Sequence, residues 1–448
     1  MLTPQAAQER AAALVDRARK AGADAADVVY LANSSESIQV RLGLLEDVER
    51  SENEHIGLRV FVGQASASIG SSDLGDAALE EMSVRAVAMA RAAPEDQYAG
   101  LAPEDLLARE LPQGLDMVDA AEPGPAQLRE MALAAEDAAR AVAGVTNSEG
   151  AGASSGRGVF ALVTSHGFAG SYETTSHGLS ASVIAGEGSG MQRDYAWRSA
   201  RHMADLLAPA EIGAMAGERA VARLDPGRVT SGAMPVVFDP RVGGSLIGHL
   251  LGAISGSAIA RRSSFLLDKA EAQLFDSAIT VLDDPHRPRG PASRPFDGEG
   301  LATAPRALVE GGRLTGWLME SASARQLGQQ PTGHASRGAS GAPGVSASNV
   351  HLAAGALTPA QLMADIKDGI YVTELIGQGV NAVTGDYSRG ASGFRIVNGE
   401  IAGPVAEFTI AGNLVDMFAA LTPANDLEWY RALNVPTLRV DGMMIAGD

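Results

Sequence analysis

A glycine-rich, uncharged segment in the middle of the chain constrains the fold more than any other feature. Between Arg241 and Arg261 lie 19 consecutive residues without a formal charge. Small residues recur at every fourth position of this segment: Gly244, Gly248, Gly252, Gly256 and Ala260. In a helix they share one face, and each glycine costs roughly 1 kcal/mol of helix stability relative to alanine. The pattern therefore predicts a deeply buried helix within residues 238–265, with another backbone packed against its glycine face.

A membrane-spanning helix is the alternative for so long an uncharged segment, because about 20 apolar residues cross a bilayer. Eight of the 19 residues are glycine or serine, and His249 is among the others. The segment is too polar for a membrane span, and nothing else in the chain approaches one. We expect no membrane partner.

Four segments carry a resemblance to a known family. They are FDPRVGGSLIGHLLGAISGSAIARRSSFL from Phe238, SRPFDGEG at 293–300, SASARQLG at 321–328 and GVNAVTGDYSRGASGFRIVNGEIAGPVAEFTIAGNLVDMF at 379–418. They resemble the TldD/PmbA family of bacterial proteins, and in particular its PmbA (TldE) branch. The likeness covers essentially the whole chain, and in the N-terminal third it is mainly one of layout.

The resemblance implies a zinc motif that has lost its ligands. In the TldD branch the equivalent helix carries His-Glu-x-x-x-His, in which two imidazoles hold zinc and the glutamate is the general base. Those positions fall here on Gly248, His249 and Ala253. The third zinc ligand of that branch is a cysteine near the C-terminus, and this chain has no cysteine. We expect neither a metal site nor a catalytic residue, and His249 is either structural or lines a peptide groove or a partner contact.

The resemblance also implies a partner. PmbA-like chains are understood to pair with a TldD-like subunit that brings the zinc. The expected function is that of the non-metal subunit of a two-component metalloprotease, which degrades or processes unfolded peptides. The isolated chain would then have no cofactor, and it could form a homodimer.

Two other functions stay open at this stage. An autonomous hydrolase without zinc could use His249, or Ser154 within the G-x-S-x-G pattern at 152–156. The residues before that pattern do not form a buried strand, so we interpret it as a flexible or peptide-contacting loop. The second alternative is a homodimeric peptide-binding scaffold that has no catalytic partner.

Further groove residues are expected in two polar segments. The Gly/Ser-rich stretch 331–349 is typical of a mobile loop, in which Arg337 could meet a substrate carboxylate. Short polar side chains in the family-like block suit turns near a groove or, equally, hydrogen-bonded core turns; they are Asn381, Thr384, Asp386 and Ser388.

Composition bears on location and on nucleic-acid binding. The formal charge of −19 discourages direct binding to nucleic acid. The absence of cysteine excludes disulfides, and residues 1–20 lack the apolar core of a secretory signal. We therefore expect a cytoplasmic protein.

The distribution of periodic segments predicts an α+β fold. Residues 1–224 should form an N-terminal α+β domain, in which 1–92 and 126–224 are two similar helix–meander–helix units. Helices are expected at 3–21, 79–92, 126–142 and 209–223, and strands at 28–32, 37–42, 57–63, 65–70, 158–164, 167–175, 179–185 and 192–198. A Pro-rich, acidic connection at 93–125 separates the units, and turn residues at 224–232 lead to a β-rich C-terminal domain, 225–448, that carries the glycine-rich helix.

Overall fold

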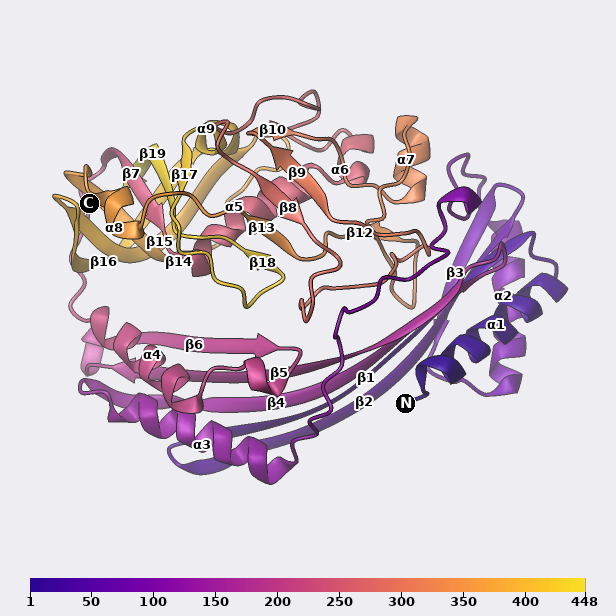
Figure 1. Ribbon diagram of the computed structural model, residues 1–448, viewed down its shortest axis with the longest axis horizontal. Coiled ribbons are helices and arrows are strands. Elements are labelled where there is room, and N and C mark those ends of the chain that lie inside the picture. The colour runs from indigo at the N-terminus through magenta and orange to yellow at the C-terminus, as the bar shows by residue number, and fades with distance from the viewer. Residues whose placement is uncertain (448) are drawn as a thin grey trace.

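The N-terminal half forms a long curved sheet, and the C-terminal half lies over it (Figure 1). The structure is a computed structural model that describes residues 1–447. Helices and strands are mixed, and strands dominate the C-terminal half. The predicted α+β class is confirmed.

The first sheet is antiparallel, with strand order β3-β2-β1-β4-β5-β6. Its strands are β1 (Ala25–Arg41), β2 (Leu44–Val62), β3 (Ala65–Ser71), β4 (Val145–Thr164), β5 (Ala169–Ala185) and β6 (Gln192–Ala200). At its centre β1 pairs with β4, from Asp27 opposite Thr164 to Val40 opposite Ala151. The two predicted units thus contribute to a single sheet.

Two pairs of helices cover the two ends of this sheet (Figure 1). They are α1 (Pro4–Lys20) and α2 (Asp76–Ala92) at one end, and α3 (Pro125–Ala141) and α4 (Pro209–Ala222) at the other. The Thr3 hydroxyl accepts a hydrogen bond from the Ala6 N–H at 3.3 Å, and Pro4 occupies the first helical position, so both features favour a helix start. All four helices lie within three residues of the predicted bounds.

The strands are longer than their apolar patterns predict. The strands expected at 28–32 and 37–42 are one strand, β1, and β2 already begins at Leu44 rather than near residue 57. The side chains of β2 from 44 to 50 are all exposed, so backbone pairing continues where no alternation of apolar residues can signal it. The loop expected at 152–156 is likewise wrong, because Ser154 lies inside β4 between Ser37 of β1 and Gly178 of β5.

The connection 93–125 runs between the first sheet and the C-terminal half. It contains the short 3-10 turn Glu104–Leu106, and two further turns, Gly188–Gly190 and Met203–Asp205, flank β6. Leu107 of this connection packs with Phe168 of the first half and Phe296 of the second. The connection therefore fills part of the junction between the halves.

The C-terminal half contains three sheets. One has the order β16-β15-β14-β7-β19-β17, and an additional β16–β19 pairing closes five of its strands into a ring. Its strands are β7 (Gly232–Phe238), β14 (Asp368–Ile376), β15 (Asp386–Val397), β16 (Glu400–Asn413), β17 (Leu421–Pro423) and β19 (Leu438–Ala446). The other two, β10-β9-β8-β13-β18 and β11-β12, consist of β8 (Val281–Asp283), β9 (Arg306–Glu310), β10 (Arg313–Leu314), β11 (Ala335–Ser336), β12 (Gly344–Val345), β13 (Val350–Leu352) and β18 (Leu433–Asn434).

The predicted glycine-rich helix is split in two. The helices of this half are α5 (Pro240–Ala253), α6 (Gly256–Ala260), α7 (Ser321–Leu327), α8 (Pro359–Met363) and α9 (Leu414–Ala419). Between α5 and α6 the backbone of Leu318 takes over the freed groups: its carbonyl accepts from the Gly256 N–H at 2.6 Å, and its N–H donates to the Ile254 carbonyl at 3.0 Å. No helix within residues 1–447 is long and apolar enough to cross a membrane.

The glycine face of α5 is not packed against another backbone, so that prediction is wrong. α5 instead buries its apolar face, which consists of Gly243, Leu246, Ile247, Leu250 and Ala253. A Cβ atom added at Gly252 would have no neighbour within 4 Å, whereas one added at Gly256 would lie 2.6 Å from both Met319 Cγ and Ser323 Oγ. Of these two glycines, therefore, only Gly256 at the start of α6 is required by the close approach of neighbouring side chains.

Replacing each of these two glycines by alanine should therefore have opposite effects. We expect Gly256→Ala to lower the free energy of unfolding by about 1–3 kcal/mol, because the added methyl group overlaps Met319 and Ser323. Gly252→Ala should raise it by about 0.5–1 kcal/mol, because it gains helix propensity in open space. Thermal and urea unfolding midpoints measure both, and equal effects of the two changes would contradict this packing.

Candidate functional site

Helix α5 brings Gly248, one of the three positions that the resemblance equates with a zinc motif, to an open pocket. The carboxylate of Asp239 caps the helix by accepting from the Arg241 N–H at 2.9 Å. Because the apolar face of α5 packs into the core, Gly244 and Gly248 turn toward a cavity of about 590 Å³. We call this cavity the α5 pocket; it is lined by Arg193, Asp194, Tyr195, Arg223, Arg241, Val242, Gly244, Ser245, Gly248, Thr373, Glu374, Leu375, Arg389, Arg431 and Leu433.

The α5 pocket lies at the junction of the two halves. Edge strand β6 and the end of α4 contribute one wall, while α5, β14 and β15 contribute the others. A second cavity, of about 470 Å³, continues along α5 past Gly252, and Leu433 borders both. The glycine face of α5 is therefore open along its length.

A buried aspartate joins the two halves at the α5 pocket. Asp194 of β6 is only 2% exposed, and its two carboxylate oxygens accept from Arg241 at 2.7 and 3.2 Å. Arg223 donates to the same carboxylate at 3.4 Å and also pairs with Glu374 of β14. Burial opposes ionisation of Asp194, but the hydrogen bonds and charge of Arg241 outweigh it and hold its pKa below the usual range.

Two arginines of the α5 pocket lack a carboxylate partner within residues 1–447, Arg389 and Arg431. The Nε of Arg389 donates to the Ile376 carbonyl at 3.4 Å. Arg431 lies 4.9 Å from the ring centres of both Trp197 and Tyr430, and it donates to the Arg241 carbonyl at 2.9 Å. The pocket thus presents positive charge that its own acids do not neutralise.

A β-bulge directs one more polar side chain, that of Thr373, into the α5 pocket. The pairing of β14 with β15 skips Thr373, between Val372 and Glu374. The Thr373 side chain lines the α5 pocket, the residue is 6% exposed, and its hydroxyl has no hydrogen-bond partner within residues 1–447. Bulges commonly redirect side chains near functional sites.

His249 is not one of the residues that line the α5 pocket. Its ring packs edge-on against Tyr387, with ring centres 6.2 Å apart. Its Nε2 is buried and has no hydrogen-bond partner among the described residues. Burial lowers the pKa of His249, and the charge of Arg389 adds to this effect. The imidazole is therefore neutral near pH 7.

The three motif positions do not supply the donors that a zinc ion requires. Structural and catalytic zinc sites use at least three protein ligands. Gly248 and Ala253 have no donor atom, so His249 offers one at most. Within residues 1–447, no group of three His, Asp or Glu side chains is arranged to hold a metal ion.

The polar residues predicted near a groove form a tight turn before and at the start of β15. The Thr384 hydroxyl donates to the Asp386 carboxylate at 2.7 Å, and Asn381 accepts from the Val383 N–H at 2.9 Å. Ser388 is exposed, and its N–H donates to the Gly379 carbonyl at 2.6 Å. None of these four residues lines the α5 pocket, although Ser388 directly precedes Arg389.

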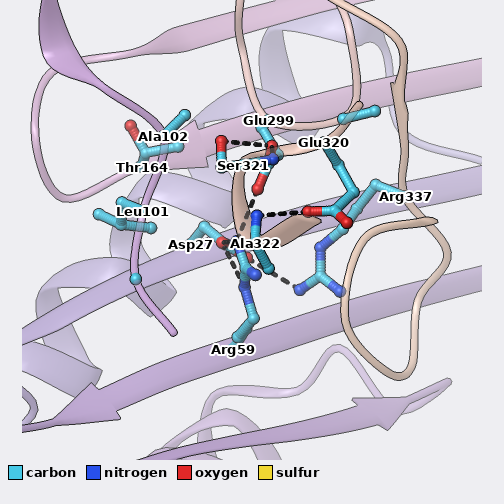
Figure 2. Close-up of polar contacts among 12 residues, drawn as sticks. Asp27, Arg59, Leu101, Ala102, Thr164, Glu299, Glu320, Ser321, Ala322 and Arg337 are labelled. Carbon is cyan, nitrogen blue, oxygen red and sulfur yellow. Dashed lines mark hydrogen bonds and ion pairs between the residues drawn. The ribbon is translucent and has the colours of Figure 1, made fainter. Parts of the chain in front are cut away.

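Arg337 lies elsewhere, in a buried cluster that joins the other end of the first sheet to the C-terminal half (Figure 2). It donates to Asp27 of β1 at 2.8 Å, and the same carboxylate accepts from Arg59 Nε at 2.7 Å. The segment expected to be a mobile loop is held down through Arg337, and Ala339 packs against Gly57. We call Asp27, Arg59, Glu299 and Arg337 the Asp27 cluster.

The Asp27 cluster contains carboxyl groups with opposite pKa shifts. Burial opposes ionisation of Asp27, but the charges of Arg59 and Arg337 prevail and lower its pKa. Burial raises the pKa of Glu299 to about 7, although Arg59 lies 3.8 Å away. Glu299 accepts hydrogen bonds from the N–H and the hydroxyl of Ser321, at 2.8 and 2.7 Å.

Sequence reasoning located α5 but missed the residues around it. Arg223, Asp194 and Arg431 are scattered over more than 200 positions, and no local spacing joins them. The motif SRPFDGEG contains Glu299, yet its burial follows only from the packing of the two halves. Asp27, a charged residue within the apolar run at the start of β1, was the available signal, whereas β6 is too polar for Asp194 to stand out.

Family models and related proteins match this chain along most of its length. Residues 26–90, 119–224 and 231–447 match domain 1, the central domain and the C-terminal domain of the PmbA/TldA metallopeptidases. Metalloprotease PmbA of Escherichia coli O157:H7 is 40% identical over 426 residues, which cover 95% of this chain and 92% of that protein. The PmbA homolog of Haemophilus influenzae is 37% identical, with coverage of 97% and 94%.

Solved structures share the fold. The crystal structure of a proposed modulator of DNA gyrase from Bacteroides thetaiotaomicron matches with a TM-score of 0.92 and 28% identity, over 100% of both chains. TldE from Thermococcus kodakarensis matches with a TM-score of 0.85 and 21% identity, over 98% of this chain and 100% of that one. The second match concerns the fold alone.

The Asp27 cluster predicts how stability depends on pH. Glu299 titrates near pH 7 when folded and near its ordinary value of 4.5 when unfolded, so the folded chain holds a proton that the unfolded chain releases. Its stabilising contribution is present below pH 4.5 and is lost as pH rises through 7. Compared with Glu299→Gln, the native chain should lose on the order of 3 kcal/mol of its free energy of unfolding between pH 4.5 and 7.

Urea unfolding at closely spaced pH values measures this difference. Exposed Glu400→Gln is the matched control and should follow the native curve. If the free energies of unfolding of the native chain and of Glu299→Gln change in parallel with pH, Glu299 titrates normally and the prediction is refuted.

Proposed function

Because the chain belongs to the PmbA/TldD metallopeptidase family, we propose that it is the non-metal, PmbA/TldE-type subunit of a two-component peptidase. Its partner is a TldD-like subunit that carries the zinc, and the pair degrades or processes unfolded peptides in the cytoplasm. This subunit shapes the binding of the peptide and supplies no metal ligand.

The single observation that carries this proposal is that α5 lies beside an open pocket and lacks the donor atoms of a zinc site. The helix keeps its place beside an open pocket, while Gly248 and Ala253 lack donor atoms and His249 is neutral against Tyr387. A Cβ atom at Gly244 or Gly248 would come no closer than 3.8 Å to another residue. This leaves room for the backbone of an extended peptide where a catalytic helix would carry its zinc ligands.

The alternative of an autonomous hydrolase has less support. Ser154 lies inside β4, paired on both sides, rather than on the sharp turn between strand and helix that exposes the Oγ of a nucleophilic serine. His249 Nε2 has no hydrogen-bond partner among the described residues, so it is not held by a neighbouring group as a general base would be. A peptide-binding scaffold without a catalytic partner remains the competing function.

Mixing experiments test the proposal. We expect the purified chain alone to bind no stoichiometric zinc and to cleave no unfolded peptide, whereas an equimolar mixture with a TldD-like chain from the same organism should reach full activity. A chelator should abolish that activity. Peptide hydrolysis and zinc content would be measured for each chain and for the mixture.

Two results would contradict the proposal. Chelator-resistant cleavage by the chain alone would indicate the autonomous hydrolase, and loss of that cleavage in Ser154→Ala would identify its nucleophile. Peptide binding without any gain of activity in the mixture would indicate the scaffold instead.

A further inference from the structure

We propose that the α5 pocket binds a carboxylate group of the peptide, either its C-terminal carboxylate or an acidic side chain. The inference rests on the proposed function, since it names the peptide chemistry that this subunit recognises. It adds a binding role for Arg389, Arg431 and Thr373.

Charge is the first argument. Five arginines and only two carboxylates line the α5 pocket, although the whole chain carries a formal charge of −19. A concave site that collects one sign of charge attracts ligands of the opposite sign. The pocket is therefore a local positive site on an acidic protein.

The second argument is the hydrogen bonding of these arginines. Asp194 and Glu374 are occupied by Arg241 and Arg223, and Arg193 is an exposed side chain 3.5 Å from Glu149. Arg389 and Arg431 remain without a carboxylate partner within residues 1–447. A guanidinium presents five N–H donors in a planar fork that matches a carboxylate.

The third argument is preorganisation. Arg431 lies against the rings of Trp197 and Tyr430, and the Arg241 carbonyl accepts one of its N–H groups. The bulge at Thr373 adds a buried hydroxyl without a partner. Little conformational entropy is lost when groups already held in place meet a ligand.

The remaining lining suits a peptide end rather than a phosphate. Val242, Leu375 and Leu433 provide apolar surface, and Gly244 and Gly248 leave space for a backbone. A helix N-terminus is a ready-made phosphate site when its N–H groups are free. At α5 these groups are blocked, because Pro240 has no N–H and the Asp239 carboxylate accepts from the Arg241 N–H.

Fluorescence anisotropy of short unfolded peptides on the full-length chain tests the proposal. The peptides carry an N-terminal fluorophore and form a set of four: free or amidated C-terminus, each with one internal Glu or Gln. We expect the fully neutralised peptide to bind at least tenfold more weakly than the peptide with both carboxylates. Whichever single carboxylate restores affinity identifies the source, and added salt should weaken binding.

Variants locate the binding site. Arg389→Met should weaken binding of the carboxylate peptides at least tenfold and leave the neutral peptide unchanged, while Arg389→Lys, which keeps the charge but loses the fork, should fall between. Thr373→Val tests the hydroxyl with little change of shape and should also weaken binding. Arg129→Met on α3 is the matched control for one lost charge on an exposed residue and should bind like the native chain.

Unchanged binding by folded Arg389→Met and Thr373→Val, or equal affinity for carboxylate and neutral peptides, would overturn the proposal. Tighter competition by inorganic phosphate than by acetate would overturn it too, because it would indicate a phosphate site. If the mixture with the TldD-like chain cleaves peptides regardless of their carboxylates, the proposed function stands and this inference fails. If carboxylate peptides bind but no mixture is active, the inference stands and the proposed function fails.

Discussion

Two buried aspartates hold the C-terminal half of this protein onto the first sheet. Asp27 on β1 pairs with Arg337, and Asp194 on β6 pairs with Arg241, each across the junction of the halves. Each aspartate also holds an arginine from its own half. Breaking such a buried pair leaves an uncompensated charge and typically costs about 3–5 kcal/mol. The relative placement of the halves, and with it the α5 pocket between them, depends on these contacts.

The pairing of Asp194 decides the chemistry of the α5 pocket. Because this carboxylate is already occupied by Arg241, it does not neutralise the other arginines, and Arg389 and Arg431 keep their charge available. α5 contributes Gly244 and Gly248 to this pocket, and neither residue has a side chain that could fill it. Gly248 has no side-chain donor atom, and its missing side chain leaves open space in the α5 pocket.

The sequence predicts the local part of this structure well and the non-local part poorly. The helix starting at Pro4 follows from its cap and its periodicity, and the resemblance places α5. The exposed part of β2 has no apolar alternation, so only its pairing with β1 reveals it. Asp27 and Arg337 are 310 residues apart, and no spacing rule connects them. The prediction that another backbone packs against the glycine face was wrong. Periodicity shows which residues share a helix face, but it does not show what lies opposite that face.

A crystal structure of the chain with a bound peptide, recorded at the zinc absorption edge, tests the central claim most directly. The account predicts a peptide along the glycine face of α5, with a carboxylate within hydrogen-bond distance of Arg389 and Arg431, and no anomalous signal beside His249. A zinc peak at His249, or a peptide bound away from α5 with the pocket empty, would contradict it.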